Sequence, residues 1–271
     1  MLKKIKPIIQ RFSRYIRFRL SVNNSPLFIG FYKYFYSPQK GSLSEFLNEY
    51  SLSKGSSFHV IQIGANDGIF NDPIHKFIKR DGWKGVLLEP QKHVFQTYLS
   101  KIYQKNKGIY PIHAAIAAED GTQKLYKIGF SNMRWATGLA SFKKENLEQA
   151  FSSGYVEKQC LKHNIPLPSP EEYITSEEIK TISPDTLLRE YNISHIDLLH
   201  IDTEGFDFEV IRLFDIQNTQ PKAIVFEHIH LSEDDKASCL SHLHQNQYQI
   251  KRFGANTLAM KHPLGKYDKF F

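Results

Sequence analysis

The order of apolar segments along the chain predicts an α/β protein with a doubly wound, mostly parallel sheet. Short apolar runs typical of buried strands occur at 58–63, 85–88, 110–116, 196–201 and 223–226. Segments with helical periodicity alternate with most of them, which is the pattern of a parallel sheet covered by helices on both faces. A chain of 271 residues is long enough for one such domain with a full core.

The helices are expected between these strands. A short helix at 42–50 should precede the first strand, because Ser42 and Glu45 form a capping-box pattern. The remaining helices are predicted at 73–80, 91–103, 184–191, 208–214 and 234–246.

Three segments depart from the alternating pattern. Asp120-Gly121 predicts a hairpin turn into an extra strand at 123–128. The following segment, 131–183, is a long insertion with a polar helical run at 145–161, and it is either a lid that sets specificity or a structural flap. The chain ends in a predicted antiparallel pair, 248–253 with 257–260.

The segment HVIQIGANDG, residues 59–68, carries the clearest functional signal. A glycine turn at the carboxyl end of a strand, before a helix, is where an open α/β sheet binds a nucleotide-like ligand. Strand 85–88 ends at Glu89, about 20 residues beyond Gly68, where a carboxylate can accept hydrogen bonds from both hydroxyls of a ribose. Turn and acid together predict a site for an adenosine-containing cofactor. The alternative is a tight turn capped by Asn and Asp without a ligand.

The residues of the turn discriminate between cofactors. A dinucleotide fingerprint has glycine at the second key position, but this chain has Asn66 there, followed by Asp67. A negative side chain beside a pyrophosphate would be repulsive. S-adenosylmethionine has no phosphate, and its sulfonium and amino-acid tail offer a cationic end for Asp67 and a carboxylate for the amides of the turn.

An ordered set of segments resembles the FkbM-type methyltransferase family. They are QIGANDG (62–68), GWKGVLLEP (82–90), AAIAAEDGT (114–122), WATGLASF (135–142), IDLLHIDTEGFDFEVI (196–211) and VFEHIHL (225–231). The resemblance implies a Rossmann-like methyltransferase fold with an antiparallel C-terminal hairpin. It also implies S-adenosylmethionine as cofactor and methylation of hydroxyl oxygens of sugars or natural products. We expect the cofactor to contact Gly64, Asn66, Asp67, Gly68, Glu89 and Ala115.

Catalytic candidates must lie at the carboxyl edge of the strands, beside the methyl group. Asp202 and Glu204 directly follow the fourth parallel strand. Asp202 is expected near the methyl or methionine end, and Glu204 is expected to bind the ammonium group or to orient an acceptor hydroxyl. Both acids precede Gly205, so they could instead cap the next helix.

A histidine could accept the proton of the acceptor. We favour His228 over His230 because it lies nearer the end of the fifth strand; a hydrogen-bonded structural histidine is the alternative. Strand alternation places Glu227 on the opposite face unless the strand has already ended.

Asp202, Glu227 and His228 or His230 would also permit a divalent metal such as magnesium or manganese. The sequence fixes none of their distances, so no metal site is predicted. Trp135 could stack on a sugar or be buried in a lid.

The basic charge of the chain is concentrated at its start. Residues 1–44 contain nine Lys or Arg and no acid, which leaves 26 basic residues against 28 acidic ones in the remainder. Apolar residues in this segment recur at helical spacing, at Leu2, Ile5, Ile9, Phe12, Ile16 and Leu20. We divide the chain into 1–41, a basic amphipathic helix with an aromatic linker, and 42–271, the methyltransferase domain.

The basic helix is too short and too charged to span a bilayer and lacks the apolar core of a secretory signal. It could lie on an anionic membrane surface, dock on the domain as a lid, or act as an organelle-targeting peptide. The two cysteines, Cys160 and Cys239, form no CxxC and predict a reducing cytosol. The expected location is therefore the cytoplasm, with peripheral contact to the inner face of a membrane through residues 1–20.

Three functions remain in competition. The first is an S-adenosylmethionine-dependent O-methyltransferase acting on a glycan, glycolipid or secondary metabolite. The second is a nicotinamide-dependent oxidoreductase, which Asn66 and Asp67 disfavour. The third is a binding module that keeps the fold without turnover. Nucleic acid is not expected as a partner, because the body has no basic stripe with interleaved aromatic residues.

Overall fold

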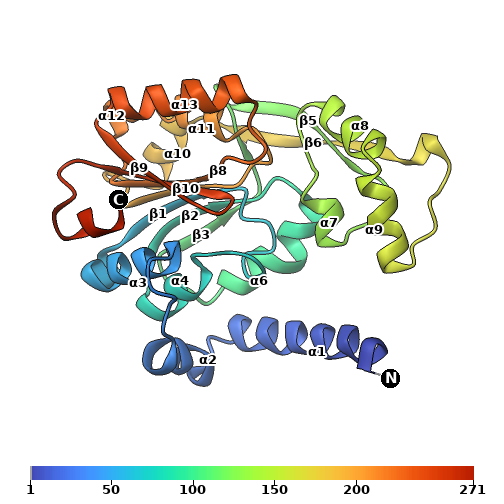
Figure 1. The fold of residues 1–271 in the computed structure, drawn as a ribbon, viewed down its shortest axis with the longest axis horizontal. Helices are drawn as coiled ribbons and strands as arrows, with labels where there is room; N and C mark the ends of the chain where they lie inside the picture. Colours follow the sequence, from blue (N-terminus) through green and yellow to red (C-terminus); the bar gives the residue numbers. More distant parts are fainter. Residues whose placement is uncertain (1) are drawn as a thin grey trace.

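The computed structural model describes residues 2–271, with side chains described from residue 12 onward. Its centre is a seven-stranded sheet with the order β3-β2-β1-β7-β8-β10-β9 (Figure 1). The strands are β1 (His59–Ile63), β2 (Lys84–Leu88), β3 (Ile109–Ile112), β7 (Leu198–Ile201), β8 (Ala223–Glu227), β9 (Tyr248–Phe253) and β10 (Asn256–Lys261). Neighbours are parallel from β3 to β8, and β10 is antiparallel to both β8 and β9. The predicted doubly wound sheet with an antiparallel C-terminal hairpin is confirmed.

Helices cover both faces of this sheet (Figure 1). One face carries α3 (Leu43–Lys54), α4 (His75–Asp81), and the continuous run of α5 (Lys92–Val94), the π-helical η3 (Phe95–Leu99) and α6 (Ser100–Tyr103). The other carries α10 (Pro184–Glu190), α11 (Asp207–Leu213), α12 (Ile216–Thr219) and α13 (Glu233–Gln245). The 3-10 turns η2 (Gly55–Ser57) and η5 (Gly265–Phe270) complete the body.

Alternate residues of the central strands point to two separate apolar cores. In β1, Val60 packs on the α3–α4 face and Ile61 on the α10–α13 face, and both are at most 1% exposed. Phe58 stacks on Trp83 with ring centroids 3.9 Å apart. Burying each side chain of this size contributes roughly 1.5–3 kcal/mol, so the two cores account for the stability of the sheet.

A second, three-stranded sheet has the order β4-β6-β5 and consists of β4 (Ala115–Ile116), β5 (Gly121–Ile128) and β6 (Ile174–Ile182), of which only β6 belongs to the insertion. The predicted hairpin at Asp120-Gly121 is wrong, because β6 lies between β4 and β5. Asp120 instead accepts hydrogen bonds from the Ser183 amide at 2.7 Å and the Thr186 hydroxyl at 2.8 Å. The turn is thereby fixed to the start of α10.

Two further predictions need correction in this region. The strand expected at 110–116 is divided, since β3 belongs to the large sheet and β4 to the small one. The helical run expected at 145–161 is two helices, α8 (Lys144–Ser152) and α9 (Tyr155–His163), separated at Gly154, which has a left-handed φ of +72°. The insertion also contains α7 (Arg134–Thr137) and the 3-10 turn η4 (Pro170–Glu172).

The N-terminal segment forms a layer on one side of the body, made of α1 (Leu2–Val22), α2 (Pro26–Gly30) and the π-helical η1 (Phe31–Phe35) (Figure 1). We call these three helices the N-terminal layer. The Ser21 hydroxyl lies 3.1 Å from His75 Nε2, and Lys79 Nζ donates to the Ser21 carbonyl oxygen at 3.0 Å. Leu2, Ile5 and Ile9 of the predicted apolar stripe lie outside the residues whose side chains are described. Among the described residues, no helix has the length and apolar character needed to cross a membrane.

The carboxyl ends of β1 and β7 meet in a contact that only glycine allows. Gly64 has a φ of +78°, and a Cβ built there would lie 1.9 Å from the Asp202 carbonyl oxygen. Asp202 in turn donates its amide to the Ile63 carbonyl oxygen at 3.0 Å. The backbone of the turn after β1 is therefore in direct contact with the backbone of the turn after β7.

Gly64→Ala should destabilise the fold far more than Gly154→Ala. Both glycines have similar left-handed φ values, but nothing lies within 4 Å of a Cβ at Gly154. Gly154→Ala should therefore cost only the backbone strain of about 1–2 kcal/mol. Gly64→Ala should cost at least about 2 kcal/mol more, since backbone must move. Urea unfolding of both variants checks this, and equal losses would contradict the close contact.

Candidate functional site

The glycine turn after β1 is fastened to the end of β2. The amides of Gly64 and Ala65 donate to the Leu88 carbonyl oxygen at 3.1 and 2.9 Å. Asn66 has a left-handed φ of +47°, and its amide donates to Glu89 Oε2 at 2.8 Å. Gly68 also needs the absence of a side chain, because a Cβ there would lie 2.6 Å from Leu99 Cδ1. These contacts hold the backbone of the turn in one conformation, with the Glu89 carboxylate hydrogen-bonded to it.

Glu89 is buried, with 2% of its surface exposed. Its Oε1 accepts from the Gln91 amide at 2.8 Å, while its Oε2 accepts from Asn66. Burial raises the pKa of Glu89 to about 7, and these hydrogen bonds and Arg134 oppose that rise. A carboxylate has about four acceptor positions, so two remain for the hydroxyls of a ribose.

Asp67 caps the turn, which is the structural role that the sequence offered as the alternative to ligand binding. Its Oδ1 accepts from the amides of Ile69 and Phe70, at 3.1 and 2.8 Å, and lies 3.3 Å from Arg134 Nη1. Burial raises the pKa of Asp67, and the arginine opposes this. The Oδ1 atom therefore caps the turn. Contact of Asp67 with the cationic end of a cofactor stays a prediction.

Arg134 is the cation that sequence reasoning missed. It lies at the start of α7, and its positive charge lowers the pKa values of Glu89, Asp202 and Glu204. Its Nη1 is buried without an aligned hydrogen-bond partner, although Asp67 is close. Gln91 Nε2 holds α7 in place by donating to the Thr137 carbonyl oxygen at 2.8 Å. The Arg134 side chain is 29% exposed, and a guanidinium beside the glycine turn is a group that can bind the carboxylate of an amino-acid tail.

One signal in the sequence could have identified Arg134 as a candidate site residue. It is the only arginine in 131–183 and directly precedes the WATGLASF segment. The neighbouring Trp135 packs on the apolar core of the insertion, near Phe130. Ala115 is buried in β4 beside Leu125 and Ile179, and its contact with the cofactor stays a prediction.

The turn after β7 presents Asp202 and Glu204 at the same edge of the sheet. Burial raises the pKa of Asp202. Glu204 has a left-handed φ of +51°, an unusual backbone for a residue other than glycine. Its Oε2 lies 3.2 Å from His230 Nε2. Burial, followed by the charges of Asp202 and Glu227, raises the pKa of Glu204 to about 8. Glu204 therefore gains or loses its proton close to neutral pH, as a general acid–base group must.

Glu227 and His230 complete a cluster with Glu204. Strand β8 ends at Glu227, so alternation no longer applies beyond it, and Glu227 Oε2 comes within 3.7 Å of His230 Nε2. Burial raises the pKa of Glu227 to about 7, helped by Asp202 and Asp207. We call Glu204, Glu227 and His230 the acid–histidine cluster.

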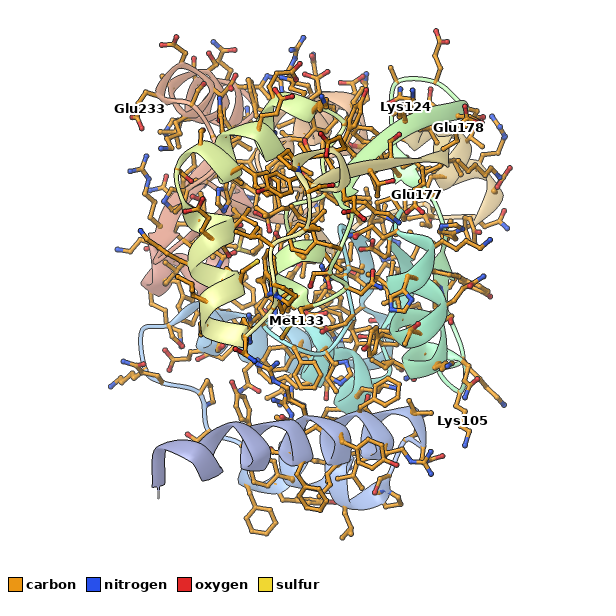
Figure 2. The ribbon with its side chains drawn as sticks, turned by 90° about the vertical axis from the view of Figure 1, so that its right-hand side faces the viewer. Lys105, Lys124, Met133, Glu177, Glu178 and Glu233 are labelled. Carbon is orange, nitrogen blue, oxygen red and sulfur yellow. The ribbon has the colours of Figure 1, made fainter. Side chains whose placement is uncertain are left out.

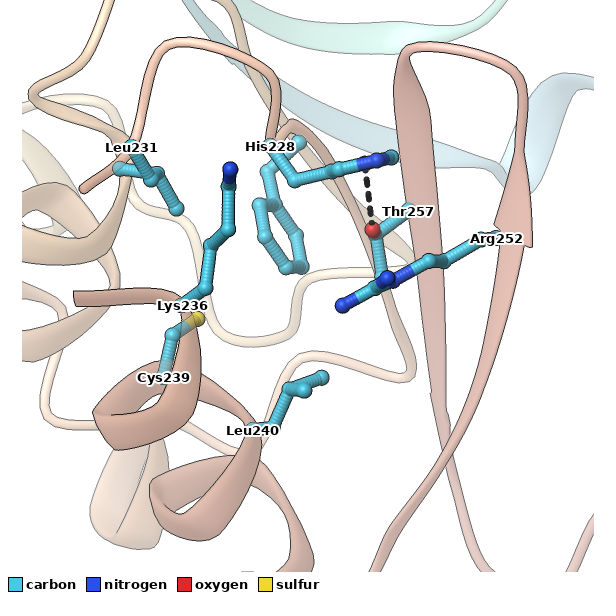
Figure 3. Close-up of a pocket in the computed structure, with 8 residues that line it drawn as sticks. His228, Leu231, Lys236, Cys239, Leu240, Arg252 and Thr257 are labelled. Carbon is cyan, nitrogen blue, oxygen red and sulfur yellow. Dashed lines mark hydrogen bonds between the residues drawn. The ribbon is translucent and has the colours of Figure 1, made fainter. Parts of the chain in front are cut away.

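His228 lies outside this cluster, so the geometry places His230 and not the expected His228 next to Glu204, and a catalytic role for His228 stays a prediction. Its Nδ1 is 3.0 Å from the Thr257 hydroxyl, and its amide donates to the Ala255 carbonyl oxygen at 3.0 Å. Figure 3 shows His228 at a small pocket between α13 and the β9–β10 hairpin, next to Thr257 and Arg252. The turn after Glu227 rotates the chain, so the histidine farther from the strand is the one that meets Glu204.

Asp207 links the turn after β7 to the end of β8. This residue is fully buried, and its Oδ2 accepts from the Thr203 hydroxyl at 2.8 Å and from the amides of Thr203 and Gly205. Its Oδ1 accepts from the Glu227 amide at 3.1 Å. One carboxylate thus fixes both the β7 turn that carries Glu204 and the end of β8. Asp207 is a positioning residue rather than a catalytic one.

The acid–histidine cluster has the spacing of a metal site. Its three ligand atoms all lie within 4.8 Å of one another, and oxygen with imidazole donors suits magnesium or manganese. His59, His195 and Asp197 have similar spacing at the amino ends of β1 and β7, the opposite edge of the sheet. There, Lys54 Nζ already lies 3.1 Å from Asp197 Oδ1, and the His59 amide donates to Oδ2.

Comparison with known proteins agrees with this geometry. The family model described as the methyltransferase FkbM domain matches residues 62–252, which include the glycine turn, Glu89 and the acid–histidine cluster. No curated protein matches the chain.

Solved methyltransferase structures show a distant likeness. The human methyltransferase 10 domain containing protein is 11% identical, covering 83% of this chain and 85% of that one, with a TM-score of 0.38. The precorrin-6y C5,15-methyltransferase from Geobacter metallireducens is 12% identical, with coverages of 84% and 94% and a TM-score of 0.35. The O-methyltransferase from Bacillus cereus, in complex with SAH, is 9% identical, with coverages of 83% and 82% and a TM-score of 0.34. We draw nothing about the site from them.

The stability of the protein should fall as the pH rises through the titration of the cluster. The folded-state pKa values of Glu204, about 8, and Glu227, about 7, lie above the ordinary value of 4.5. Their contribution is fully present below pH 4.5 and is lost as the pH rises through 7 and 8. In the double variant Glu204→Gln/Glu227→Gln, the decrease in unfolding free energy between pH 5 and 8.5 should be smaller by about 2 kcal/mol.

Urea unfolding at several pH values measures this difference. Glu178→Gln, at an exposed position on β6 (Figure 2), removes a charge outside the cluster and should leave the pH dependence unchanged. Identical pH profiles for the wild type and the double variant would contradict the raised pKa values.

Proposed function

Because this chain belongs to the FkbM methyltransferase family and is an S-adenosylmethionine-dependent methyltransferase, we propose that it methylates a hydroxyl oxygen of a glycan, glycolipid or secondary metabolite. The observation that carries the choice of a hydroxyl is the Glu204–His230 contact of 3.2 Å at the carboxyl edge of the sheet. A hydroxyl must lose a proton as it is methylated, and this pair provides an acceptor for it.

The residues around the glycine turn suit S-adenosylmethionine. Glu89 has acceptor positions left for the ribose, and the Arg134 guanidinium suits the carboxylate of the methionine tail. The amides of the turn, which the sequence predicted for this carboxylate, already donate within the protein. The cofactor supplies an already activated methyl group, so the protein mainly has to align the acceptor and accept its proton. Asp202, whose backbone contacts Gly64, is the acid that we assign to the cationic end.

The acid–histidine cluster performs the proton chemistry in this proposal. Burial lowers the pKa of His230, which keeps the imidazole neutral and able to accept a proton. Glu204 orients the ring, and in its ionised form, above its pKa of about 8, it stabilises the imidazolium that forms. Glu227 and Glu204 also offer acceptors for further hydroxyls of a polyhydroxylated substrate, which favours a sugar over an isolated alcohol.

Glu89→Gln should weaken binding of S-adenosylhomocysteine by about 1.5–3 kcal/mol, roughly tenfold to a hundredfold in Kd, because charge-assisted hydrogen bonds are lost. Isothermal titration calorimetry measures the affinity, and circular dichroism verifies that the variant is folded. The exposed Glu178→Gln should bind as tightly as the wild type. Unchanged affinity in folded Glu89→Gln would remove Glu89 from the cofactor site.

His230→Asn and Glu204→Gln should each lower kcat by about 10²–10⁴-fold, the usual contribution of general acid–base catalysis. S-adenosylhomocysteine affinity should stay within about threefold, since neither side chain is assigned to the cofactor. His228→Asn, the same change outside the cluster, should retain activity. The assay follows methyl transfer to panels of saccharides, natural products and amines.

Two outcomes would overturn this assignment. Transfer only to amines would contradict the hydroxyl acceptor. Loss of activity in EDTA, restored by magnesium or manganese, would reassign the acid–histidine cluster from proton acceptor to metal site. The proposal predicts activity that persists in EDTA.

A further inference from the structure

The N-terminal layer exposes an unusual concentration of large apolar side chains. Among the side chains described, residues 12–271, seven of the fourteen exposed large hydrophobic residues fall between positions 12 and 35. They include Leu27 at 81% exposure, Phe35 at 78% and Tyr34 at 73%. Figure 2 shows side chains of this layer projecting away from the body of the protein. Exposed apolar patches of this kind mark interaction surfaces.

Phe12 and Ile16 of the apolar stripe of α1 face away from the domain, because the opposite face of the helix makes the contacts. Phe18 meets Tyr98 edge-on with centroids 5.7 Å apart, and Ser21 bonds to His75. Phe12 and Ile16, on the other side of the helix, are 64% and 38% exposed. The contacts of α1 with the domain therefore leave Phe12 and Ile16 exposed.

The same layer is strongly basic. Residues 2–35 include eight Lys or Arg and no acid, and Arg19 and Lys33 are exposed within the described part. A symmetric dimer through this surface would bring these like charges together. An anionic lipid surface complements them, and aromatic residues prefer the headgroup region of a bilayer.

We propose that the N-terminal layer binds peripherally to the surface of an anionic lipid bilayer. Exposed aromatic and aliphatic side chains of α1, α2 and η1 enter the headgroup region, while the basic residues pair with lipid phosphates. The guanidinium groups of Arg14 and Arg17 lie 5.4 and 5.6 Å from the ring of Phe70, two residues after the glycine turn. The bound layer is thus in direct contact with the segment that follows the cofactor turn.

Vesicle flotation of the full-length protein tests this directly and needs no substrate. The protein should float with phosphatidylcholine vesicles containing about 30% phosphatidylserine, and the bound fraction should fall at higher salt. Phe31→Ser/Phe35→Ser, at exposed positions, should lower the partition coefficient at least about tenfold. Lys33→Gln should lower it about fivefold. Leu161→Ser on α9, where the wild-type residue is 83% exposed, is the matched control and should bind normally.

Each remaining outcome overturns the proposal. The first is absence of binding to anionic vesicles, and the second is binding that Phe31→Ser/Phe35→Ser leaves unchanged. The third is a dimer, detected by analytical ultracentrifugation, that the same double variant dissociates, because the surface would then be occupied by a second copy of the chain. Circular dichroism of the variants verifies that a loss of binding is not a loss of folding.

Discussion

The contact between the turns that follow β1 and β7 is the constraint on which the site depends. It forms between β1 and β7, where the strand order reverses. Open α/β sheets bind their ligands at such a position. Gly64 must lack a side chain there because the Asp202 carbonyl oxygen occupies the space. The contact sets the separation between the cofactor turn and the acids that act next to it.

Two buried carboxylates hold these turns in place by accepting hydrogen bonds from backbone amides. Glu89 binds the amide of Asn66 in the glycine turn, and Asp207 binds amides of the β7 turn and of Glu227. Both are buried, so each hydrogen bond acts in a medium of low dielectric constant and is hard to replace with water. Glu204, Glu227 and His230 lie beside this hydrogen-bonded frame, and the raised pKa values of Glu204 and Glu227 suit these two acids to proton transfer near neutral pH. The acids that hold the turns in place are therefore not the acids that we propose for proton transfer.

Sequence patterns predicted the large sheet well, because each of its strands is a local apolar run and each turn has its own signature. The site was predicted less completely. Alternation identified the faces of β8 only as far as Glu227, so it could not indicate that His230 rather than His228 reaches Glu204. Arg134 arrives from the insertion, and its distance from Asp67 depends on the path of α7 rather than on any local pattern. The Asp120 turn was misread because its hydrogen-bond partners lie more than sixty residues away.

The most direct measurement is thermal unfolding of the wild-type protein with S-adenosylhomocysteine, with NAD and with neither. A ligand present at a hundred times its Kd should stabilise the folded state by about 2.7 kcal/mol. Our account predicts an increase in Tm with S-adenosylhomocysteine and none with NAD, because Asn66 and Asp67 leave no place for a pyrophosphate. An increase with NAD alone, or no increase with either ligand, would contradict the assignment of the cofactor site.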